Sequence, residues 1–100
     1  MYEIEQTETY RRWFAALRDA QAKSRIDARL LRLAGGNPGD IRFVGGGVLE
    51  LKIDYGPGYR VYYMRKGAVL ILLLAGGDKR TQVRDIRAAI ELAAAEKGDK

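Results

Sequence analysis

The stretch VLELKIDYGPGYRVYYMRK, residues 48–66, decides the fold. Apolar and polar residues alternate on both sides of the glycine-rich GPG at 56–58, which is typical of two half-buried strands joined by a tight turn. We therefore predict an antiparallel hairpin whose strands cover 48–55 and 59–66.

The two faces of this hairpin carry different chemistry. The face predicted to lie against the core holds apolar and aromatic residues: Leu49, Leu51, Ile53, Tyr55, Tyr59, Val61 and Tyr63. The polar face holds Glu50, Lys52, Asp54, Arg60, Tyr62, Met64 and Lys66. With GPG as the loop, Asp54 lies opposite Arg60, and Lys52 lies opposite Tyr62. This face fits either a solvated surface with an exposed Asp54–Arg60 ion pair, worth under about 1 kcal/mol, or a surface that binds phosphate.

The remaining elements follow from periodicity outside the hairpin. A short strand at 2–6 precedes two helices, at 7–19 with Thr7 as N-cap and at about 21–34, and GGNPGD ends the second helix. A short strand near 41–44 leads into the hairpin. The run AVLILLLAGG (68–77) is apolar up to its glycines and predicts a central strand covered on both faces. A last helix covers about 79–95, with apolar residues turned inward: Val83, Ile86, Ile90 and Ala93.

The predicted fold class is α+β, in the order β-α-α-β-β-β-β-α. Two helices pack on a mostly antiparallel sheet, and a C-terminal helix follows. The length of 100 residues predicts a single domain over 1–100.

Composition narrows the chemistry. The chain has no cysteine and no histidine, so disulfides, thiolate metal sites, histidine bases and most zinc sites are excluded, and we expect no metal or other cofactor. The net charge of +5 fits either an acidic partner, such as nucleic acid or an acidic protein, or a solubilising surface. The N-terminus lacks the apolar stretch of a signal peptide, and the longest apolar run is too short to cross a bilayer, so we expect a cytoplasmic protein.

Two further segments concentrate positive charge. In GGDKRTQ (76–82), Asp78 can cap the last helix, while Lys79 and Arg80 stand in its first turn, where cations oppose the helix dipole. This segment fits a phosphate-binding corner or two side chains that simply extend into solvent.

The second helix carries Arg25, Arg29 and Arg32 on one face. Such a basic stripe is usually a solvated face, and otherwise it binds nucleic acid or an acidic partner.

Three segments in order carry a family resemblance: GNPGD (36–40), ELKIDYGPGYRVYY (50–63) and LLLAGGDKRTQVRDI (72–86). Together they resemble type II toxins of the RelE/ParE superfamily, and within it the HigB-like killer-protein branch of addiction modules. The resemblance implies a small microbial-ribonuclease-like fold and, as the activity, cleavage of mRNA in the ribosomal A site. Other members of the superfamily instead poison DNA gyrase. The implied partners are a cognate antitoxin, usually of the helix-turn-helix type, together with the ribosome and mRNA; operator DNA is reached only through the antitoxin complex, and no membrane is involved.

The same resemblance implies roles for individual residues. The arginine of the family's GYR motif matches Arg60, the lysine on the preceding strand matches Lys52, and the basic residue after the last strand matches Lys79; these three are the predicted catalytic residues. Two departures stand out. No tyrosine or histidine follows Tyr63, where several relatives place an acid or base, and Glu50 stands where a relative has lysine.

The chemistry assigns further expectations. RNA cleavage without a metal needs a base, a charge that stabilises the phosphorane, and an acid. Arg60 suits stabilisation, Tyr62 suits proton donation or stacking, and Glu50 is the obvious anionic base on the sheet face. The predicted RNA- or phosphate-binding residues are Arg80, Tyr62, Lys66, Arg25, Arg29 and Arg32. A non-enzymatic gyrase inhibitor or a basic binding module is the alternative.

Overall fold

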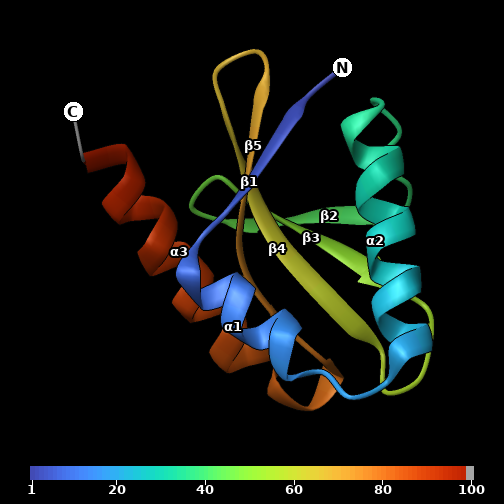
Figure 1. The fold of residues 1–100 in the computed structure, drawn as a ribbon. Helices are drawn as coiled ribbons and strands as arrows, with labels where there is room; N and C mark the ends of the chain where they lie inside the picture. The colour runs from blue at the N-terminus through green and yellow to red at the C-terminus, as the bar shows by residue number, and fades with distance from the viewer. Residues whose placement is uncertain (99–100) are drawn as a thin grey trace.

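Five strands form one mixed sheet in the order β1-β5-β4-β3-β2 (Figure 1). The computed structural model describes residues 1–98, so the last two residues of the predicted 1–100 domain lie outside the described residues. β1 pairs with β5 in parallel, and all other neighbours are antiparallel. The elements are β1 (Glu3–Gln6), α1 (Glu8–Ala16), α2 (Ala20–Ala34), β2 (Ile41–Gly45), β3 (Val48–Ile53), β4 (Tyr59–Lys66), β5 (Leu70–Gly77), the 3-10 helix η1 (Lys79–Thr81) and α3 (Gln82–Gly98). The predicted α+β class, element order and mostly antiparallel sheet are confirmed.

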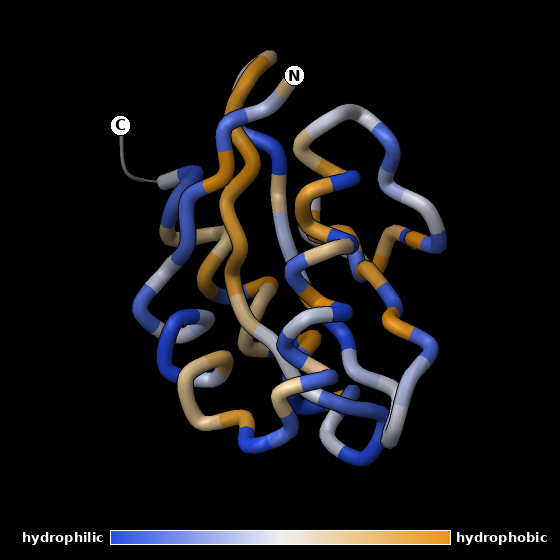
Figure 2. The backbone as a smooth tube through the Cα atoms, turned by 45° about the vertical axis from the view of Figure 1, so that its right-hand side comes forward, coloured by the Kyte–Doolittle hydropathy of each residue, from blue (hydrophilic) through white to orange (hydrophobic). Residues whose placement is uncertain are grey.

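Helices cover both faces of the sheet. α1 and α2 pack on one face through a core that includes Tyr10, Ile26 and Leu33. α3 packs on the other face, where Ala89 and Ala93 contact a second buried cluster. β5 is therefore buried on both sides, as its unbroken apolar sequence predicted; Figure 2 shows it as a continuous hydrophobic segment through the middle of the molecule.

The first helix begins where its capping residue predicts. The Thr7 side chain accepts a hydrogen bond from the Tyr10 amide, which satisfies one of the free N–H groups of the first turn. The Thr7 hydroxyl also donates to the Leu74 carbonyl at 2.7 Å, so the same residue ties the start of α1 to the central strand.

The hairpin register differs from the prediction. Lys52 pairs with Arg60 and Ile53 with Tyr59, so the expected pairing of Asp54 with Arg60 is wrong. The turn takes up residues 54–58, because β3 already ends at Ile53 and the Gly58 amide donates to the Tyr55 carbonyl. The pairing has moved by two residues, which leaves the alternation of faces unchanged.

The polar face of the hairpin is not a solvated surface. α3 and η1 cover much of it, so that Glu50, Arg60, Tyr62 and Met64 are all buried. Tyr62 and Met64 belong to the second core instead.

The inward face of α3 also differs in one position. Ala93 is buried and Ile86 and Ile90 are partly buried, as predicted, but Val83 is 73% exposed. The helix contacts the sheet through its small residues, Ala89 and Ala93, and this orientation turns Val83 towards solvent.

Candidate functional site

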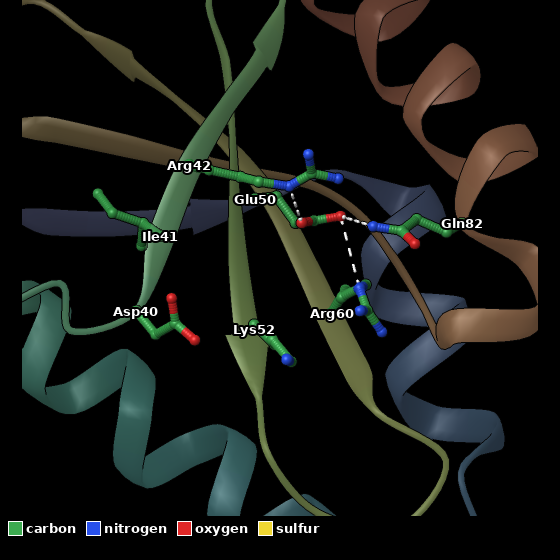
Figure 3. Close-up of a pocket in the computed structure, with 7 residues that line it drawn as sticks. All are labelled: Asp40, Ile41, Arg42, Glu50, Lys52, Arg60 and Gln82. Carbon is green, nitrogen blue, oxygen red and sulfur yellow. Dashed lines mark hydrogen bonds and ion pairs between the residues drawn. The ribbon is translucent and has the colours of Figure 1, made fainter.

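A cavity of about 400 Å³ opens on the sheet face where β2, β3 and β4 meet the start of α3 (Figure 3). It is lined by Asp40, Ile41, Arg42, Glu50, Lys52, Arg60 and Gln82. Two of the three predicted catalytic residues, Lys52 and Arg60, therefore share one cavity, and the observed register makes them direct neighbours across the hairpin.

Glu50 is the buried anion of this cavity. Its Oε1 accepts a hydrogen bond from Arg42 Nε at 2.7 Å, and its Oε2 accepts from Gln82 Nε2 at 2.7 Å and from the Tyr62 hydroxyl at 3.1 Å. Burial alone would raise the pKa of Glu50, but the hydrogen bonds from Arg42, Gln82 and Tyr62 together outweigh it and hold the pKa below its ordinary value. A carboxylate with its lone pairs engaged and its pKa lowered is a poor base, so the geometry suits Glu50 to holding its neighbours.

Arg60 is held from two directions. Its Nη1 donates to the Gly58 carbonyl at 2.5 Å, and its Nε lies 3.6 Å from Glu50 Oε2. Gly58 has a φ of +80°, and a β-carbon there would lie 3.0 Å from Arg60 Nη1. Glycine at this position lets the turn approach the guanidinium closely, which fixes the orientation of Arg60 in the cavity.

Lys52 combines a fixed backbone with an exposed side chain. Its amide donates to the Asp40 carbonyl at 3.1 Å, and its carbonyl accepts from Arg29 Nη1 at 2.5 Å. The side chain is exposed and points into the cavity, and its ammonium group has no ion-pair partner within residues 1–98 (Figure 3). An exposed cation on a fixed backbone is thus available to a ligand.

Asp40 is one of three polar cavity residues that the sequence analysis did not predict. It is exposed and lines the cavity at the end of the GNPGD loop, where Gly39 has a φ of +70°. Unlike Glu50, its carboxylate accepts no hydrogen bond from any residue of the described chain. GNPGD was interpreted as a helix stop and as part of the family resemblance, with no role given to Asp40, although an aspartate that directly precedes a strand of the site sheet was the available signal.

Arg42 and Gln82 were missed as well. Arg42 pairs with Glu50 across the β2–β3 ladder, which no motif indicated. Gln82 begins α3 and reaches Glu50 from 32 residues away in sequence, a contact that only the tertiary fold creates.

Lys79 and Arg80 lie beside the cavity and do not line it. The Lys79 amide lies 3.4 Å from the Pro57 carbonyl, which connects η1 to the hairpin turn. Asp78 caps the 3-10 helix η1, which precedes α3: its side chain accepts from the Arg80 amide at 2.9 Å, and the Arg80 guanidinium folds back onto the same carboxylate at 3.0 Å. The Arg80 amide and guanidinium are therefore both bonded to Asp78.

The other predicted RNA-binding residues lie apart from the cavity. Tyr62 is fully buried, which leaves no ring face on which a base could stack. Lys66 lies at the far end of β4, where it pairs with Glu96 at 2.7 Å. The three arginines of α2 line a separate hollow of about 310 Å³, together with Ala28, Ile53 and Asp54. The structure thus brings Lys52 and Arg60 together and distributes the remaining basic residues around them.

Within this basic hollow, two arginines already have partners. Arg29 also donates to the Pro38 carbonyl at 3.0 Å, and the Arg25 guanidinium lies 4.7 Å from the centre of the Tyr55 ring. Arg29 therefore supports the loop and strand that carry Asp40 and Lys52.

The family model of the phage-derived protein Gp49-like family (DUF891) matches residues 6–97, which include every residue of the cavity. The chain belongs to the Gp49-like family. An uncharacterized protein of Haemophilus influenzae strain Rd is 48% identical over 91 residues, covering 91% of this chain and 92% of that protein. The Gp49-like family is a toxin-like family related to addiction modules, which agrees with the resemblance at this coarser level.

Within residues 1–98, no group of three or more histidine, cysteine, aspartate or glutamate side chains is arranged to hold a metal ion. None of the helices in this range is long and apolar enough to span a membrane.

Proposed function

We propose that this Gp49-like protein is the toxin of a type II toxin–antitoxin system and acts as a metal-independent, ribosome-dependent mRNA endoribonuclease. The observation that carries the proposal is the cavity in which the anchored Arg60 and the exposed Lys52 are neighbours. Two adjacent cations on a rigid sheet match the charge of a phosphodiester and of the phosphorane formed from it.

The proposed reaction uses the RNA's own 2′-hydroxyl. Its oxygen forms a bond to the adjacent phosphorus, the bond from phosphorus to the 5′-oxygen breaks, and a 2′,3′-cyclic phosphate and a 5′-hydroxyl result. One proton leaves the 2′-hydroxyl and one is added to the 5′-oxygen. Arg60 stabilises the charge of the phosphorane, because the planar fork of a guanidinium cation matches two phosphate oxygens.

Asp40 is the candidate for the general base. Its carboxylate shares the cavity with Lys52 and has no hydrogen-bond donor among residues 1–98. Lys52 either neutralises the phosphate or supplies the proton to the leaving oxygen, while Glu50 holds Arg60. The same proposal keeps Lys79 as a phosphate contact, because Lys79 lies close to the turn that holds Arg60. A β-carbon added at Gly58 would lie 3.7 Å from the β-carbon of Lys79 and 3.0 Å from Arg60 Nη1.

The RNA-binding surface is proposed to extend beyond the cavity. Lys52 lines the cavity, and the next two residues of the chain line the basic hollow of α2, so the two sites adjoin along the end of β3. Arg25 and Arg32 would contact flanking phosphates there, with Arg80 and Lys66 at greater distance. The proposed partners are the ribosome with its mRNA and a cognate antitoxin, and the proposed compartment is the cytoplasm.

A purified translation system tests this function. mRNA is incubated with the protein, with and without ribosomes, and the cut sites are mapped by primer extension. Cuts that require ribosomes and leave a 2′,3′-cyclic phosphate and a 5′-hydroxyl end are expected. Intact mRNA under all conditions would exclude the nuclease.

One observation favours a non-enzymatic gyrase inhibitor as the second candidate. Glu50 and Tyr62 are both buried and hydrogen-bonded to each other, so neither is free to exchange a proton with a substrate. A protein that only binds its target through a basic face needs no general acid or base. Supercoiling by purified gyrase in the presence of the protein distinguishes the two, because only the gyrase inhibitor would stop it.

A further inference from the structure

β2 forms an open edge of the sheet. The Lys52 amide donates to the Asp40 carbonyl, so these two residues form a hydrogen-bonded pair of the antiparallel ladder. Hydrogen-bonded and non-bonded pairs alternate, so Ile41 and Phe43 direct their N–H and C=O groups away from β3. No strand among the described residues pairs with this edge, because β2 is the last strand of the sheet. An extended segment of another chain can therefore add to it.

The two faces of β2 present different surfaces to such a segment. Phe43 is 76% exposed and, with Ile41 and Leu49 on the same face, lines an apolar cavity of about 340 Å³, which Met64 and Lys97 reach from the side of α3. On the other face, Arg42 lines the cavity that holds Lys52 and Arg60. The apolar groove thus adjoins the proposed active site along β2, and Ile41 lines both cavities.

The charges beside this edge are mostly positive. Arg65 and Lys97 line the apolar groove, and Arg42 is exposed on the opposite face. A strand that pairs with β2 alternates its side chains between the two faces. Its complement is therefore a segment in which apolar residues, facing the groove, alternate with carboxylates, facing Arg42 and Lys52.

We propose that the β2 edge is the docking site of the antitoxin, through an extended segment in which acidic and apolar residues alternate. This inference rests on the proposed function for the identity of the partner. The acidic side chains of the bound segment lie at Arg42, at the margin of the active-site cavity, and compete there with the phosphate groups of RNA. Neutralisation follows from direct occupation of the site by negative charge.

A second copy of this chain fits the edge poorly. Antiparallel pairing of two β2 edges would bring Arg42 of one molecule close to Arg42 of the other. Like charges on opposed strands are destabilising, whereas an acidic segment meets them with the opposite sign.

The binding test uses a fluorescein-labelled synthetic peptide of alternating glutamate and valine, followed by anisotropy. Two control peptides accompany it: one with the same residues in two blocks, and one with lysine in place of glutamate. The alternating acidic peptide is expected to bind about tenfold tighter than the block peptide, a difference that alternation of the two faces explains and net charge does not. Equal binding of the two acidic peptides would overturn the proposal.

Variants locate the site. Phe43→Ala is expected to weaken the alternating peptide about tenfold, and Phe43→Pro, which also removes the outward N–H, several-fold further. Val69→Ala is the matched control, since Val69 is also exposed but lies in the β4–β5 turn, and it should bind as the wild type does. In hydrogen exchange, the peptide should protect the amides of Ile41 and Phe43. Unchanged binding by both Phe43 variants, or no protection at these amides, would overturn the proposal.

Two further results would distinguish the docking site from a dimer interface and from the nuclease activity. Sedimentation that shows a dimer of the protein alone, abolished by Phe43→Ala, would assign the edge to a second copy and reject the acidic partner. The peptide assay contains neither RNA nor ribosomes, so loss of peptide binding with mRNA cleavage intact rejects only the docking site. Peptide binding without cleavage rejects the nuclease and leaves the docking site in place.

Discussion

The Oε2 atom of Glu50 lies 3.6 Å from the Nε atom of Arg60, and both side chains are buried beneath the start of α3. The same carboxylate accepts hydrogen bonds from Gln82, Tyr62 and Arg42, so its position is fixed independently of Arg60. The anion compensates the buried guanidinium charge, while the Gly58 carbonyl holds the opposite end of the group. Contacts within the protein thus set the orientation of Arg60, the side chain proposed to bind phosphate, and this orientation does not depend on RNA.

Replacement of Arg60 tests its role in the reaction. Arg60→Lys keeps the charge but loses the planar fork that binds two phosphate oxygens, and Arg60→Ala loses both. We expect ribosome-dependent cleavage to fall about 10²–10³-fold in Arg60→Ala, the usual cost of removing a group that stabilises a transition-state oxyanion. Arg60→Lys should recover only part of this loss. Single-turnover cleavage of a ribosome-bound mRNA measures both rates.

Arg87→Ala is the matched control, because Arg87 is an exposed arginine of α3 outside the cavity. Full cleavage by a folded Arg60→Ala protein would remove Arg60 from the mechanism.

Replacement of Glu50 by glutamine should lower stability in a pH-dependent manner. The folded pKa of Glu50 is lowered by its hydrogen bonds, so its contribution is fully present above the ordinary glutamate pKa and is lost as the pH falls through the folded pKa. We expect Glu50→Gln to cost about 1–3 kcal/mol at neutral pH, since buried donors lose a charged acceptor. The difference in the free energy of unfolding between the variant and the wild type should become smaller in acid. Urea unfolding at neutral pH and near pH 3 gives the two values.

An exposed glutamate provides the comparison for this measurement. Glu91→Gln on α3 should change the free energy of unfolding by less than about 0.5 kcal/mol at either pH. If the gap between wild type and Glu50→Gln widened in acid, the direction of the Glu50 pKa given above would be wrong.

Asp40→Asn tests the proposed general base. Asparagine keeps the shape of the side chain but cannot accept a proton, so we expect the cleavage rate to fall about 10²-fold, within the usual range for a general base. The acidic limb of the pH–rate profile should disappear with it. Binding of a non-cleavable RNA, with a 2′-methoxy group at the cut site, should be unaffected or tighter. Asp27→Asn, an exposed aspartate of α2, is the control; an unchanged pH profile in Asp40→Asn would assign the base elsewhere.

The fold was predictable because its signals are local. Alternation identified β3 and β4, the unbroken apolar run identified β5, and Thr7 marked the start of α1. The register was not predictable from the GPG motif, because the length of the turn depends on where β3 ends, and β3 stops at Ile53. The burial of the polar face also escaped prediction, since the sequence of α3 shows an inward face but does not show which face of the sheet it covers.

The site was predictable only in part, and for a related reason. Lys52 and Arg60 were named because the resemblance matches them to family residues, and sequence alternation placed both on one face of one hairpin. Asp40, Arg42 and Gln82 enter the cavity from a loop, the neighbouring strand and the last helix. Only the tertiary arrangement brings these three elements together. The hydrogen bonds that Arg42 and Gln82 donate to Glu50 could therefore not be predicted from the sequence.

Gly76 is expected to tolerate no side chain. A β-carbon at Gly76 would overlap three atoms of the Trp13 ring, which is rigid and packed between α1 and the sheet. We predict that Gly76→Ala destabilises the protein by about 1–3 kcal/mol, the usual cost of overpacking. Gly98→Ala is the control, because nothing lies within 4 Å of the added carbon. Thermal unfolding of the two variants provides the measurement, and equal midpoints would contradict the contact with Trp13.

Replacement of Arg29 tests whether this side chain stabilises the fold or contacts RNA. Its guanidinium donates to the carbonyls of Lys52 and Pro38, so it joins β3 to the loop before β2. We expect Arg29→Ala to lower the free energy of unfolding by about 1–2 kcal/mol and to slow cleavage by loosening Lys52. Arg32→Ala, on the same helix face but exposed, should leave stability unchanged and only reduce the salt dependence of RNA binding. If the two variants proved equally stable and both altered only the salt dependence, Arg29 would be a phosphate contact like its neighbour, and the position of Lys52 would depend on β3 alone.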